Sequence, residues 1–370
     1  MYQCNRTLLF TLLLLMIVVV LILTFYYNSE TEELGNVVLL DNVDYDQQPQ
    51  SYLDHDRLFD LRLRYDVSGE NCAIGTPLFA VILVTSYFGN VETRSAIRRA
   101  FPKDSLRDLN ATFVFLLGRK SDDMFVKQDA VLDEAHRFGD ILQGNFREAY
   151  RNLTYKHLMG LKWASERCAN AEYVVKMDDD IVVNLPEILK VLRNVKLPQK
   201  LLAGYILKDM EPKREKANKW FVTEDEYRDK VYPTFLSGWF YVTNPKTSRS
   251  LVRAVRGEKY FWIDDTFITG ILARKVKIKH YNLGDYFTVH PEFLRCCMSD
   301  VSKLSVGCEV MIGPNGGDAN LFFEFNRALG KCWKSGSCKK RDLPLNRTCV
   351  AERVVNLGRG TSVIEDYKLS

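Results

Sequence analysis

Three adjacent carboxylates, Asp178, Asp179 and Asp180, form the most distinctive chemical feature of this sequence. The block that contains them begins at Lys176 and directly follows an apolar stretch over residues 173–175, which is typical of a buried strand. In an extended chain Asp178 and Asp180 project to one side and Asp179 to the other. Two carboxylates on one side suit Mg²⁺ or Mn²⁺, which favour carboxylate and phosphate oxygens. The alternative is an exposed acidic turn, but the preceding strand favours the metal site.

A second acidic pair, Asp264 and Asp265, lies between the apolar segments 261–263 and 266–268. We expect at least one of these carboxylates to be partly buried. Burial raises the pKa of a carboxyl group, and a raised pKa suits a general base. The competing interpretation is a helix N-cap in front of a helix predicted over residues 266–273. Both interpretations can hold if one acid caps the helix and the other is catalytic.

Several basic side chains could meet a phosphate group. Arg94 and Arg98 are four residues apart and therefore share one helix face, although such a run is more often a solvated surface. Lys156 is equally ambiguous. His157 lies on an apolar helix face, where a hydrogen-bonded core histidine is the usual interpretation. Five histidines and the absence of a Gly-x-Ser-x-Gly motif argue against a Ser-His-Asp hydrolase.

These residues need a scaffold, and strand and helix signals alternate from Pro77 onward. Helices are predicted over residues 91–101 and 150–168. Such alternation implies an α/β fold with a mostly parallel sheet and helices on both faces. In such sheets ligands bind beyond the carboxyl ends of the strands, where the three aspartates are expected. The predicted strands cover residues 78–84, 112–117, 173–177, 201–205 and 239–243.

The N-terminal region predicts a membrane anchor. Residues 8–27 carry no charge, and about 20 helical residues span roughly 30 Å of hydrocarbon. A cleaved signal peptide is the alternative, but the apolar run is longer than usual and lacks a small-residue cleavage site. Arg6 precedes the run, so the positive-inside rule places residues 1–7 in the cytosol and the remainder in the lumen. Residues 28–70 are acidic and predict a weakly ordered stem, with a short helix near residues 58–63.

Composition excludes other classes of protein. The chain has 370 residues, a net charge of +4 and 26% charged residues, so it is not a mostly disordered protein. This modest charge gives no reason to expect a nucleic-acid partner. Three glycosylation sequons begin at Asn110, Asn152 and Asn346, and we expect Asn152 to lie in a helix. Eight cysteines follow the predicted anchor, and sequence alone cannot choose among their pairings. They are Cys72, Cys168, Cys296, Cys297, Cys308, Cys332, Cys338 and Cys349.

Taken in order, the motifs resemble those of the β1,3-galactosyltransferase family over about residues 79–273. Any one motif would be a modest signal, whereas the ordered set is specific. The predicted anchor and stem agree with the type II membrane topology of that family. The matching motifs are Arg94-Ser-Ala-Ile-Arg98, the Phe-Leu-Leu-Gly stretch ending at Gly118, the segment 145–156, the block 176–184, and the segment 232–242.

The resemblance implies a GT-A-like fold in a lumenal catalytic domain, residues 71–370, with a Cys-rich C-terminal segment. It implies a Golgi membrane enzyme that moves a hexose, with inversion, from a UDP-sugar to an acceptor glycan on a glycoprotein or glycolipid. UDP-galactose is the favoured donor, and UDP-N-acetylglucosamine and UDP-N-acetylgalactosamine are the alternatives. A bound Mn²⁺ or Mg²⁺ is implied as cofactor.

The resemblance also implies roles for individual residues. Asp178 and Asp180 would hold the metal, and a later histidine, His290, could complete its shell. Asp265 would be the catalytic base. The residues expected near the nucleotide are Arg94, Arg98, Lys156, Asp178 and Asp179.

Four positions depart from the family pattern. Asp264 replaces a glutamate, Phe101 replaces a tryptophan, Thr269 stands where glycine is usual, and Phe240 stands where a second small residue is expected. Trp239 and Phe240 are therefore expected to reshape the sugar pocket. These departures leave an alternative from another class, a catalytically silent lumenal protein that binds glycans or assists a related enzyme.

Overall fold

The structure is a computed structural model, and it describes the chain from residue 63 onward with several gaps. The predicted cytosolic tail, the anchor apart from Met16 and Val19, and most of the stem with its short helix lie outside the described residues. Within the described part, no helix combines the length and apolar character needed to cross a membrane. The described residues are 63–69, 72, 77–119, 126–195, 197–335 and 338–349, with Met16, Val19 and Val38–Leu39 before them.

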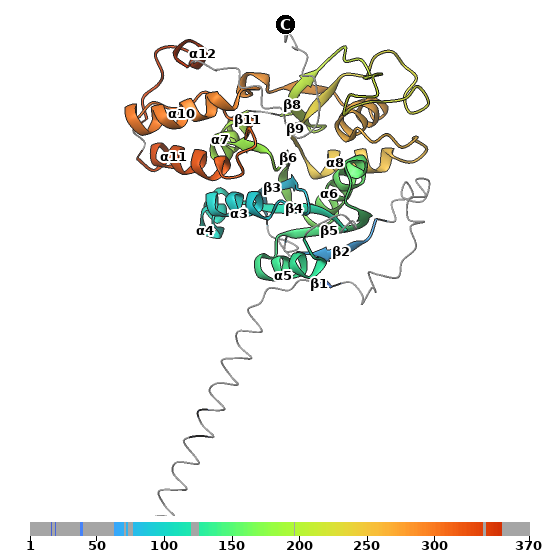
Figure 1. The fold of residues 1–370 in the computed structure, drawn as a ribbon, viewed down its shortest axis with the longest axis horizontal. Helices are drawn as coiled ribbons and strands as arrows, with labels where there is room; N and C mark the ends of the chain where they lie inside the picture. Colours follow the sequence, from blue (N-terminus) through green and yellow to red (C-terminus); the bar gives the residue numbers. More distant parts are fainter. Residues whose placement is uncertain are drawn as a thin grey trace, which may run out of the picture.

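A nine-stranded sheet forms the centre of the described part (Figure 1), in the order β1-β2-β5-β4-β3-β6-β9-β8-β10. Within it, β2 and β9 run opposite to the other strands, so the mostly parallel sheet expected of a GT-A-like fold is confirmed. The strands are β1 (Val38–Leu39), β2 (Tyr65–Ser68), β3 (Leu78–Thr85), β4 (Ala111–Arg119), β5 (Ile141–Arg147), β6 (Ala171–Asp178), β8 (Leu202–Leu207), β9 (Phe235–Thr243) and β10 (His280–Asn282).

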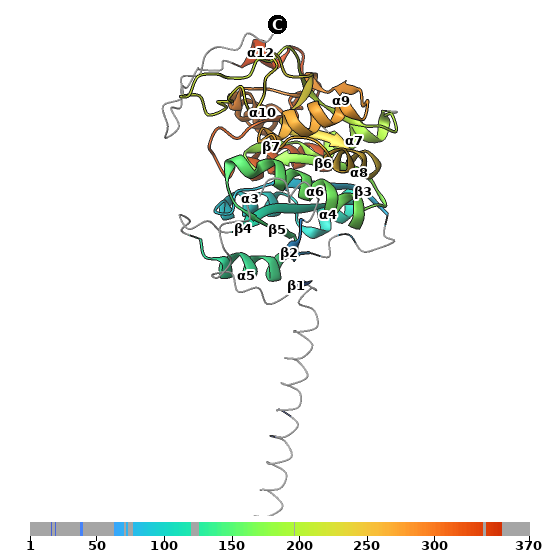
Figure 2. The same ribbon diagram turned by 90° about the vertical axis from the view of Figure 1, so that its right-hand side faces the viewer.

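Helices cover both faces of this sheet, as predicted. Figure 1 shows α3, α10 and α11 on one side and α6 and α8 on the other, and Figure 2 shows α5 and α12 at opposite ends of the domain. A second, two-stranded sheet pairs β7 (Ile181–Val183) with β11 (Ile312–Pro314). The helices are α3 (Val91–Ala100), α4 (Lys103–Leu109), α5 (Gln128–Phe138), α6 (Leu153–Arg167), α7 (Leu185–Asn194), α8 (Pro245–Ala254), α9 (Ala273–Lys275), α10 (Pro291–Leu304), α11 (Leu321–Ser335) and α12 (Leu345–Thr348), with 3₁₀ turns η2 (Tyr150–Asn152) and η4 (Gly284–Tyr286).

Strand β3 shows why the central strands form. Its side chains alternate between two separate hydrophobic clusters, with Ile82 and Val84 in one and Val81 and Leu83 in the other. A parallel strand that is covered by helices on both faces requires apolar residues at every position. The unbroken apolar run in the sequence is therefore the direct signature of a central strand.

The helix predicted over residues 266–273 is instead a π-helix, η3 (Thr266–Leu272), followed by the short α9. The Thr269 hydroxyl donates to the Asp265 carbonyl at 2.7 Å and accepts from the Leu236 N–H at 2.9 Å. These bonds tie the helix to β9 where the family pattern has glycine. Such π-helical turns are rare and concentrate at functional sites.

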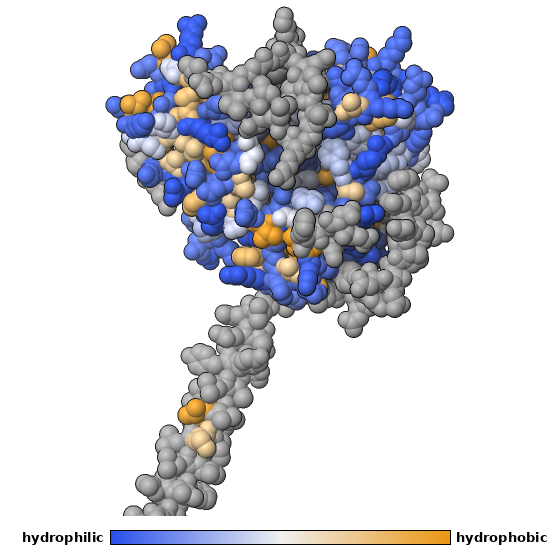
Figure 3. All heavy atoms as spheres, viewed as in Figure 1, coloured by the Kyte–Doolittle hydropathy of each residue, from blue (hydrophilic) through white to orange (hydrophobic). Residues whose placement is uncertain are grey.

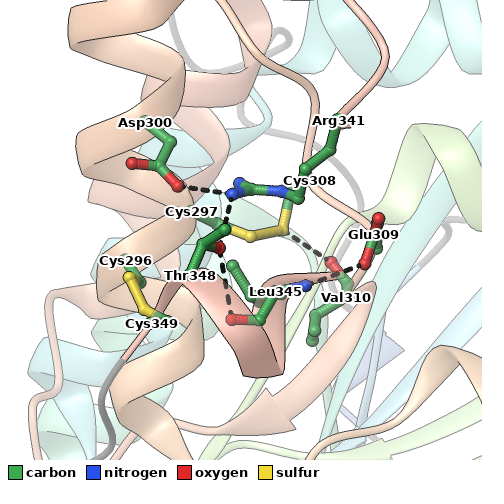
Figure 4. The surroundings of a disulfide bond; sticks show 10 residues. All are labelled: Cys296, Cys297, Asp300, Cys308, Glu309, Val310, Arg341, Leu345, Thr348 and Cys349. Atoms are coloured by element: carbon green, nitrogen blue, oxygen red, sulfur yellow. Dashed lines mark hydrogen bonds and ion pairs between the residues drawn. A yellow bond between two sulfur atoms is a disulfide. The ribbon is translucent and has the colours of Figure 1, made fainter. Parts of the chain in front are cut away.

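The eight cysteines after the predicted anchor form four disulfides, a pairing that the sequence could not supply. Cys72–Cys168 ties the segment before β3 to the end of α6, and Cys332–Cys338 closes a short loop. Figure 4 shows the other two bridges, where the Arg341 guanidinium also donates to Asp300 at 2.7 Å. Disulfides stabilise small C-terminal elements of this kind by restricting the unfolded chain. Those two bridges are Cys296–Cys349 and Cys297–Cys308.

The three glycosylation sequons differ in solvent exposure. Asn110 and Asn346 are exposed, whereas Asn152 is buried and donates its side-chain N–H to the Arg147 carbonyl at 2.9 Å. The expectation that Asn152 lies in a helical segment is confirmed, because it ends η2 and precedes α6. The face drawn in Figure 3 is mostly hydrophilic, with apolar residues scattered in small groups.

Candidate active site

The three aspartates lie at the carboxyl end of β6, in the middle of the sheet. Asp178 is the last residue of β6 and pairs with Thr85, the last residue of β3. Asp179 and Asp180 form the turn that leads into β7. The structure therefore places the acidic cluster at the strand ends where an α/β sheet binds its ligands.

Asp179 stabilises the loop between β3 and α3. Its Oδ2 accepts hydrogen bonds from the Ser86 hydroxyl at 2.7 Å, the Tyr87 N–H at 3.3 Å and the Asn90 side chain at 3.0 Å. These three donors satisfy a buried carboxylate. The structure thus gives Asp179 a loop-supporting position, and its contact with the nucleotide stays a prediction.

Lys176 connects the two acidic clusters. Its Nζ lies 2.6 Å from Asp178 Oδ1 and also donates to the Gly238 carbonyl. The Gly238 N–H in turn donates to Asp265 Oδ2 at 3.2 Å. A Cβ at Gly238 would lie 3.3 Å from Asp265 Oδ2, so glycine permits this close approach. The carboxylates that the sequence placed 87 residues apart therefore share one site.

Asp265 combines both roles that its sequence context allowed. Its Oδ1 accepts from the Thr266 N–H at 2.6 Å and so caps η3, while Oδ2 faces Gly238. Burial, reinforced by the negative charge of Asp264, raises the pKa of Asp265 to about 7. A carboxylate with a pKa near neutrality is suited to accept a proton from a hydroxyl group.

Asp264 remains ionised because buried polar groups support it. Burial opposes its charge, but the hydrogen bond from His157 and the charge of Lys176 hold its pKa below the ordinary value. His157 Nδ1 lies 2.8 Å from Asp264 Oδ2, and Nε2 contacts the Tyr241 hydroxyl. Burial lowers the pKa of His157. A neutral imidazole that donates from Nδ1 and accepts at Nε2 satisfies both contacts.

The prediction of a hydrogen-bonded core histidine at position 157 is confirmed, since the side chain is fully buried. Its link to the acidic pair was missed, as were the positions of Lys176 and Gly238 between the clusters. No spacing in the sequence reveals these contacts, because they join β6, α6 and β9. The motif match alone drew attention to Lys176 and Gly238.

The two predicted phosphate-binding arginines form buried ion pairs. The Arg94 guanidinium is fully buried and lies 2.6 Å from Glu134 Oε2, and it also donates to the Tyr87 carbonyl at 2.9 Å. Arg98 pairs with Glu134 and with Asp140, each at 2.7 Å. The interpretation of this run as a solvated surface is therefore wrong. A direct contact with a phosphate stays a prediction and would require these pairs to open.

Lys156 supports the same loop. Its buried Nζ donates to the Ser86 carbonyl at 2.6 Å and contacts Glu148. Ser86 thus receives contacts from Lys156, Arg94 and Asp179. Three of the five residues predicted to bind the nucleotide therefore converge on one loop at the end of β3, and their contact with a nucleotide stays a prediction.

The donor set at Asp178 and Asp180 fits a divalent cation. Burial, together with the charges of Asp180 and Asp264 and against that of Lys176, raises the pKa of Asp178 to about 7. Burial, reinforced by Asp179, also raises the pKa of Asp180. A cation would relieve this repulsion. In the described part of the chain no group of three or more His, Cys, Asp or Glu side chains is arranged around one point. The remaining ligands would therefore come from phosphate oxygens and water, which Mg²⁺ and Mn²⁺ commonly retain.

His290 lies near this region but is not shown to join it. It is exposed, precedes α10, and its ring lies 5.3 Å from that of Phe293. The next residue, Pro291, lies 3.0 Å from a Cβ built at Gly316. The adjacent Asn315 donates its N–H to the Asp180 carbonyl at 2.8 Å. The role of His290 as a metal ligand stays a prediction.

Phe240 is a core residue, and its expected effect on the sugar pocket stays a prediction. Its side chain is fully buried in the cluster opposite to that of Tyr241 and packs against Phe287. Alternation along β9 causes this, because neighbouring side chains point to opposite faces of the sheet. Trp239 is half-buried beside the same cluster as Phe240.

Comparison with known proteins establishes the family. The sequence model of the galactosyltransferase family matches residues 92–284, more than half of the chain. The chain belongs to the galactosyltransferase family. The matched span contains both acidic clusters and the connecting Lys176. As a member of this galactosyltransferase family, the protein is a hexosyltransferase.

Individual relatives agree with this assignment. The chain is 33% identical to mouse beta-1,3-galactosyltransferase 5 over 236 residues, which cover 64% of this chain and 75% of the relative. It is 32% identical to human beta-1,3-galactosyltransferase 2 over 212 residues, which cover 56% of this chain and 50% of that protein. Among solved structures, the WbbM bifunctional glycosyltransferase in its apo form has a TM-score of 0.37 at 13% identity, covering 68% of this chain and 50% of that one. A score at this level does not itself establish a shared fold.

Proposed function

We propose that this galactosyltransferase-family protein transfers a hexose, with galactose as the favoured sugar, from a UDP-sugar to a hydroxyl group of an acceptor glycan, forming a β1,3 linkage. One observation carries the proposal. The Lys176–Gly238 connection links Asp265, the proposed base, to Asp178, whose carboxylate would bind the cation that holds the diphosphate. The names of its relatives support galactose as the transferred sugar.

The proposed chemistry is a single displacement with inversion. Asp265 Oδ2 accepts the proton of the acceptor hydroxyl while that oxygen forms a bond to the anomeric carbon of the donor. The bond between this carbon and the diphosphate oxygen breaks, and UDP leaves with the electron pair. With a pKa of about 7, Asp265 is about half ionised at neutral pH, so it can accept the proton and still hold it.

Asp264, His157 and Lys176 have supporting roles in this proposal. The charge of Asp264 raises the pKa of Asp265 and so strengthens the base. His157 holds Asp264 in position through the hydrogen bond between its Nδ1 and Asp264 Oδ2. Lys176 keeps Asp178 close to Asp265 and balances part of the negative charge. None of these three needs to contact the substrate.

Asp178 and Asp180 would hold Mn²⁺ or Mg²⁺, with His290 as a further candidate ligand. The bound cation would neutralise the charge that builds on the leaving diphosphate. The protein's own contribution is to keep the two carboxylates at the turn between β6 and β7, where Asn315 binds the Asp180 carbonyl at 2.8 Å.

The cellular setting is also part of the proposal. A type II anchor at residues 8–27 would place the domain in the Golgi lumen, where it would meet glycans on glycoproteins or glycolipids. The four disulfides support an oxidising compartment, since such bridges are rare in the cytosol. The two exposed sequons are compatible with that setting.

A donor screen tests the proposal. The full-length protein, in detergent, is incubated with Mn²⁺, an acceptor panel and UDP-galactose, UDP-N-acetylglucosamine or UDP-N-acetylgalactosamine, and released UDP is measured. We expect release with one donor, most strongly UDP-galactose, and its loss on chelation of the metal. Thermal protection by UDP and Mn²⁺ without turnover of any donor would instead indicate the catalytically silent alternative.

A further inference from the structure

Two exposed aromatic side chains from distant parts of the chain meet near the acidic pair. Tyr150 belongs to η2 and Trp220 to the long connection between β8 and β9. Their exposed fractions are 48% and 41%, and one cation lies against both rings, with Lys219 Nζ 4.6 Å from the Trp220 ring and 5.8 Å from the Tyr150 ring. Large aromatic side chains are normally buried, so an exposed pair that shares one cationic neighbour is a candidate binding surface.

The pair lies on the Asp265 side of the site. The Tyr150 ring lies 5.8 Å from the ring of Trp262, which precedes Asp264 by two residues in the chain. Burial, with the charges of Asp264 and Asp265, raises the pKa of Tyr150 to about 12. Asp179, in contrast, faces the loop between β3 and α3. The aromatic pair, from η2 and the β8–β9 connection, therefore lies on the Asp264–Asp265 side of the site, whereas the loop between β3 and α3 lies on the Asp179 side.

The aromatic surface has a fixed support. Behind Tyr150 lies the buried Trp262, at a ring separation of 5.8 Å, and the Arg151 guanidinium covers the Trp262 ring at 4.5 Å. Lys219 Nζ lies 4.6 Å from the Trp220 ring and 5.8 Å from the Tyr150 ring. Cation–π contacts of this kind hold rings without covering both faces.

The connection that carries Trp220 is itself anchored. The Arg214 guanidinium donates to the Val222 carbonyl at 2.9 Å and to the Tyr227 carbonyl at 2.7 Å. Val222 is fully buried, and the Trp220 N–H donates to Asn218 Oδ1 at 2.9 Å. Trp220 is thus presented from a braced loop, which lowers the entropy lost when a ligand binds.

A pyranose ring matches such a surface. One face of the ring presents C–H groups, which pack on aromatic rings, while its rim presents hydroxyl groups, which need polar partners. Ligand sites commonly combine aromatic walls with a few polar groups that fix orientation. Here the walls are Tyr150 and Trp220, and the polar group next to them is Asp265.

We propose that Tyr150 and Trp220 form the stacking wall for the acceptor sugar, so that the connection between β8 and β9 sets acceptor preference. This inference rests on the proposed function, which places the acceptor hydroxyl at Asp265. The donor diphosphate would lie at Asp178 and Asp180 instead. Stacking on two rings fixes the sugar plane and leaves its rim directed at the base.

The test compares Michaelis constants for the two substrates. Methyl β-glycosides of galactose, N-acetylglucosamine and N-acetylgalactosamine are the acceptor probes, and UDP release by the full-length protein is the readout. In Trp220→Ala and in Tyr150→Ala we expect KM for the preferred glycoside to rise about tenfold or more, with a smaller change in KM for the UDP-sugar. Trp220→Phe, which retains a ring, should recover most of the loss. Tyr281→Ala, at an exposed tyrosine of β10, is the matched control and should behave as the wild type.

The other possible results distinguish a failure of this inference from a failure of the proposed function. A rise in KM for the UDP-sugar alone would assign the wall to the donor and overturn the inference, and unchanged constants would do the same. If the wild type releases no UDP from any donor, the proposed function fails instead. Tryptophan fluorescence then still tests the wall, because a methyl glycoside should shift the emission of the wild type and not of Trp220→Phe. An unchanged wild-type spectrum would overturn the inference in that case.

Discussion

Two buried groups of charged residues in this protein differ in the balance between positive and negative charge. Arg94 and Arg98 meet Glu134 and Asp140, so cations and anions are equal in number and every charge has a partner. Burial opposes the charge of Glu134, yet the two arginines hold its pKa below the ordinary value. We call these four residues the paired network.

The second group has an excess of acids. Asp178, Asp264 and Asp265 share one lysine, Lys176, and the neighbouring His157 is neutral. Burial and neighbouring charge raise the pKa of Asp178 and of Asp265 to about 7. Charges that balance one another fix a loop, whereas unbalanced carboxylates are available to bind a cation or accept a proton. We call this second group the acidic centre.

The largest expected effect is on catalysis, through Asp265. Asp265→Asn keeps the shape and the N-cap acceptor oxygen but removes the base, so we expect kcat to fall about 10²- to 10⁴-fold. Thermal stability should be unchanged or higher, because a buried like-charge contact with Asp264 is relieved. UDP release and a thermal unfolding curve measure the two effects. Activity within threefold of the wild type would remove Asp265 from the mechanism.

The paired network should respond in the opposite way. Glu134→Gln leaves two buried guanidinium groups without their shared carboxylate, and breaking a buried pair from one side costs about 3–5 kcal/mol of stability. We expect this loss in chemical denaturation, together with weaker binding of UDP because Arg94 also positions the Tyr87 carbonyl. Asp140→Asn, which leaves the Arg94–Glu134 pair intact, should cost less. Equal stability of Glu134→Gln and the wild type would contradict the comparison.

The two groups also predict opposite dependences on pH. The folded-state pKa of Asp265 is raised from 3.8 to about 7, so its contribution to stability is present below pH 3.8 and is lost as pH rises through 7. The folded-state pKa of Glu134 is lowered, so its contribution is present above its ordinary pKa of 4.5 and is lost as pH falls further. Activity should rise with pH through about 7 as Asp265 ionises.

Asp264→Asn separates the two causes of the raised pKa of Asp265, which are burial and the charge of Asp264. Removing the neighbouring charge should move the rising limb of the kcat/KM profile to lower pH. Stability must be measured with a chelator present, because a bound cation also alters the carboxylates. A limb that stays in place would show that Asp264 does not tune the base.

Much of the scaffold could be predicted because local patterns report it directly. The apolar run of β3 indicated a central strand, and the structure confirms it, with the acidic end of β6 at the edge of the sheet. That this edge binds a ligand stays a prediction. The π-helix was not predictable from local patterns, since its Thr269 hydroxyl accepts a hydrogen bond from the Leu236 N–H of the distant strand β9. The burial of Phe240 was also not evident, because the motif was compared without the alternation of side chains along the strand.

The site was harder to predict than the sheet. Sequence motifs identified the acidic residues, but the sequence does not show whether a carboxylate is paired with a cation or unpaired. Only tertiary contacts show that Glu134 satisfies Arg94 and Arg98, which the sequence offered as phosphate ligands. Likewise, His157 supports Asp264 from a helix 107 residues away in the chain.

The smallest expected effect comes from an exposed ion pair, which serves as the reference for both buried groups. Asp104 and Arg107 pair across one turn of α4, with side chains 83% and 78% exposed. Solvent screens such pairs, and their measured contributions are about 0–1 kcal/mol. Arg107→Ala should therefore change stability by less than about 1 kcal/mol and leave UDP release unchanged. A loss as large as that of Glu134→Gln would mean that burial and balance do not distinguish the paired network, and the difference between the two groups would need another cause.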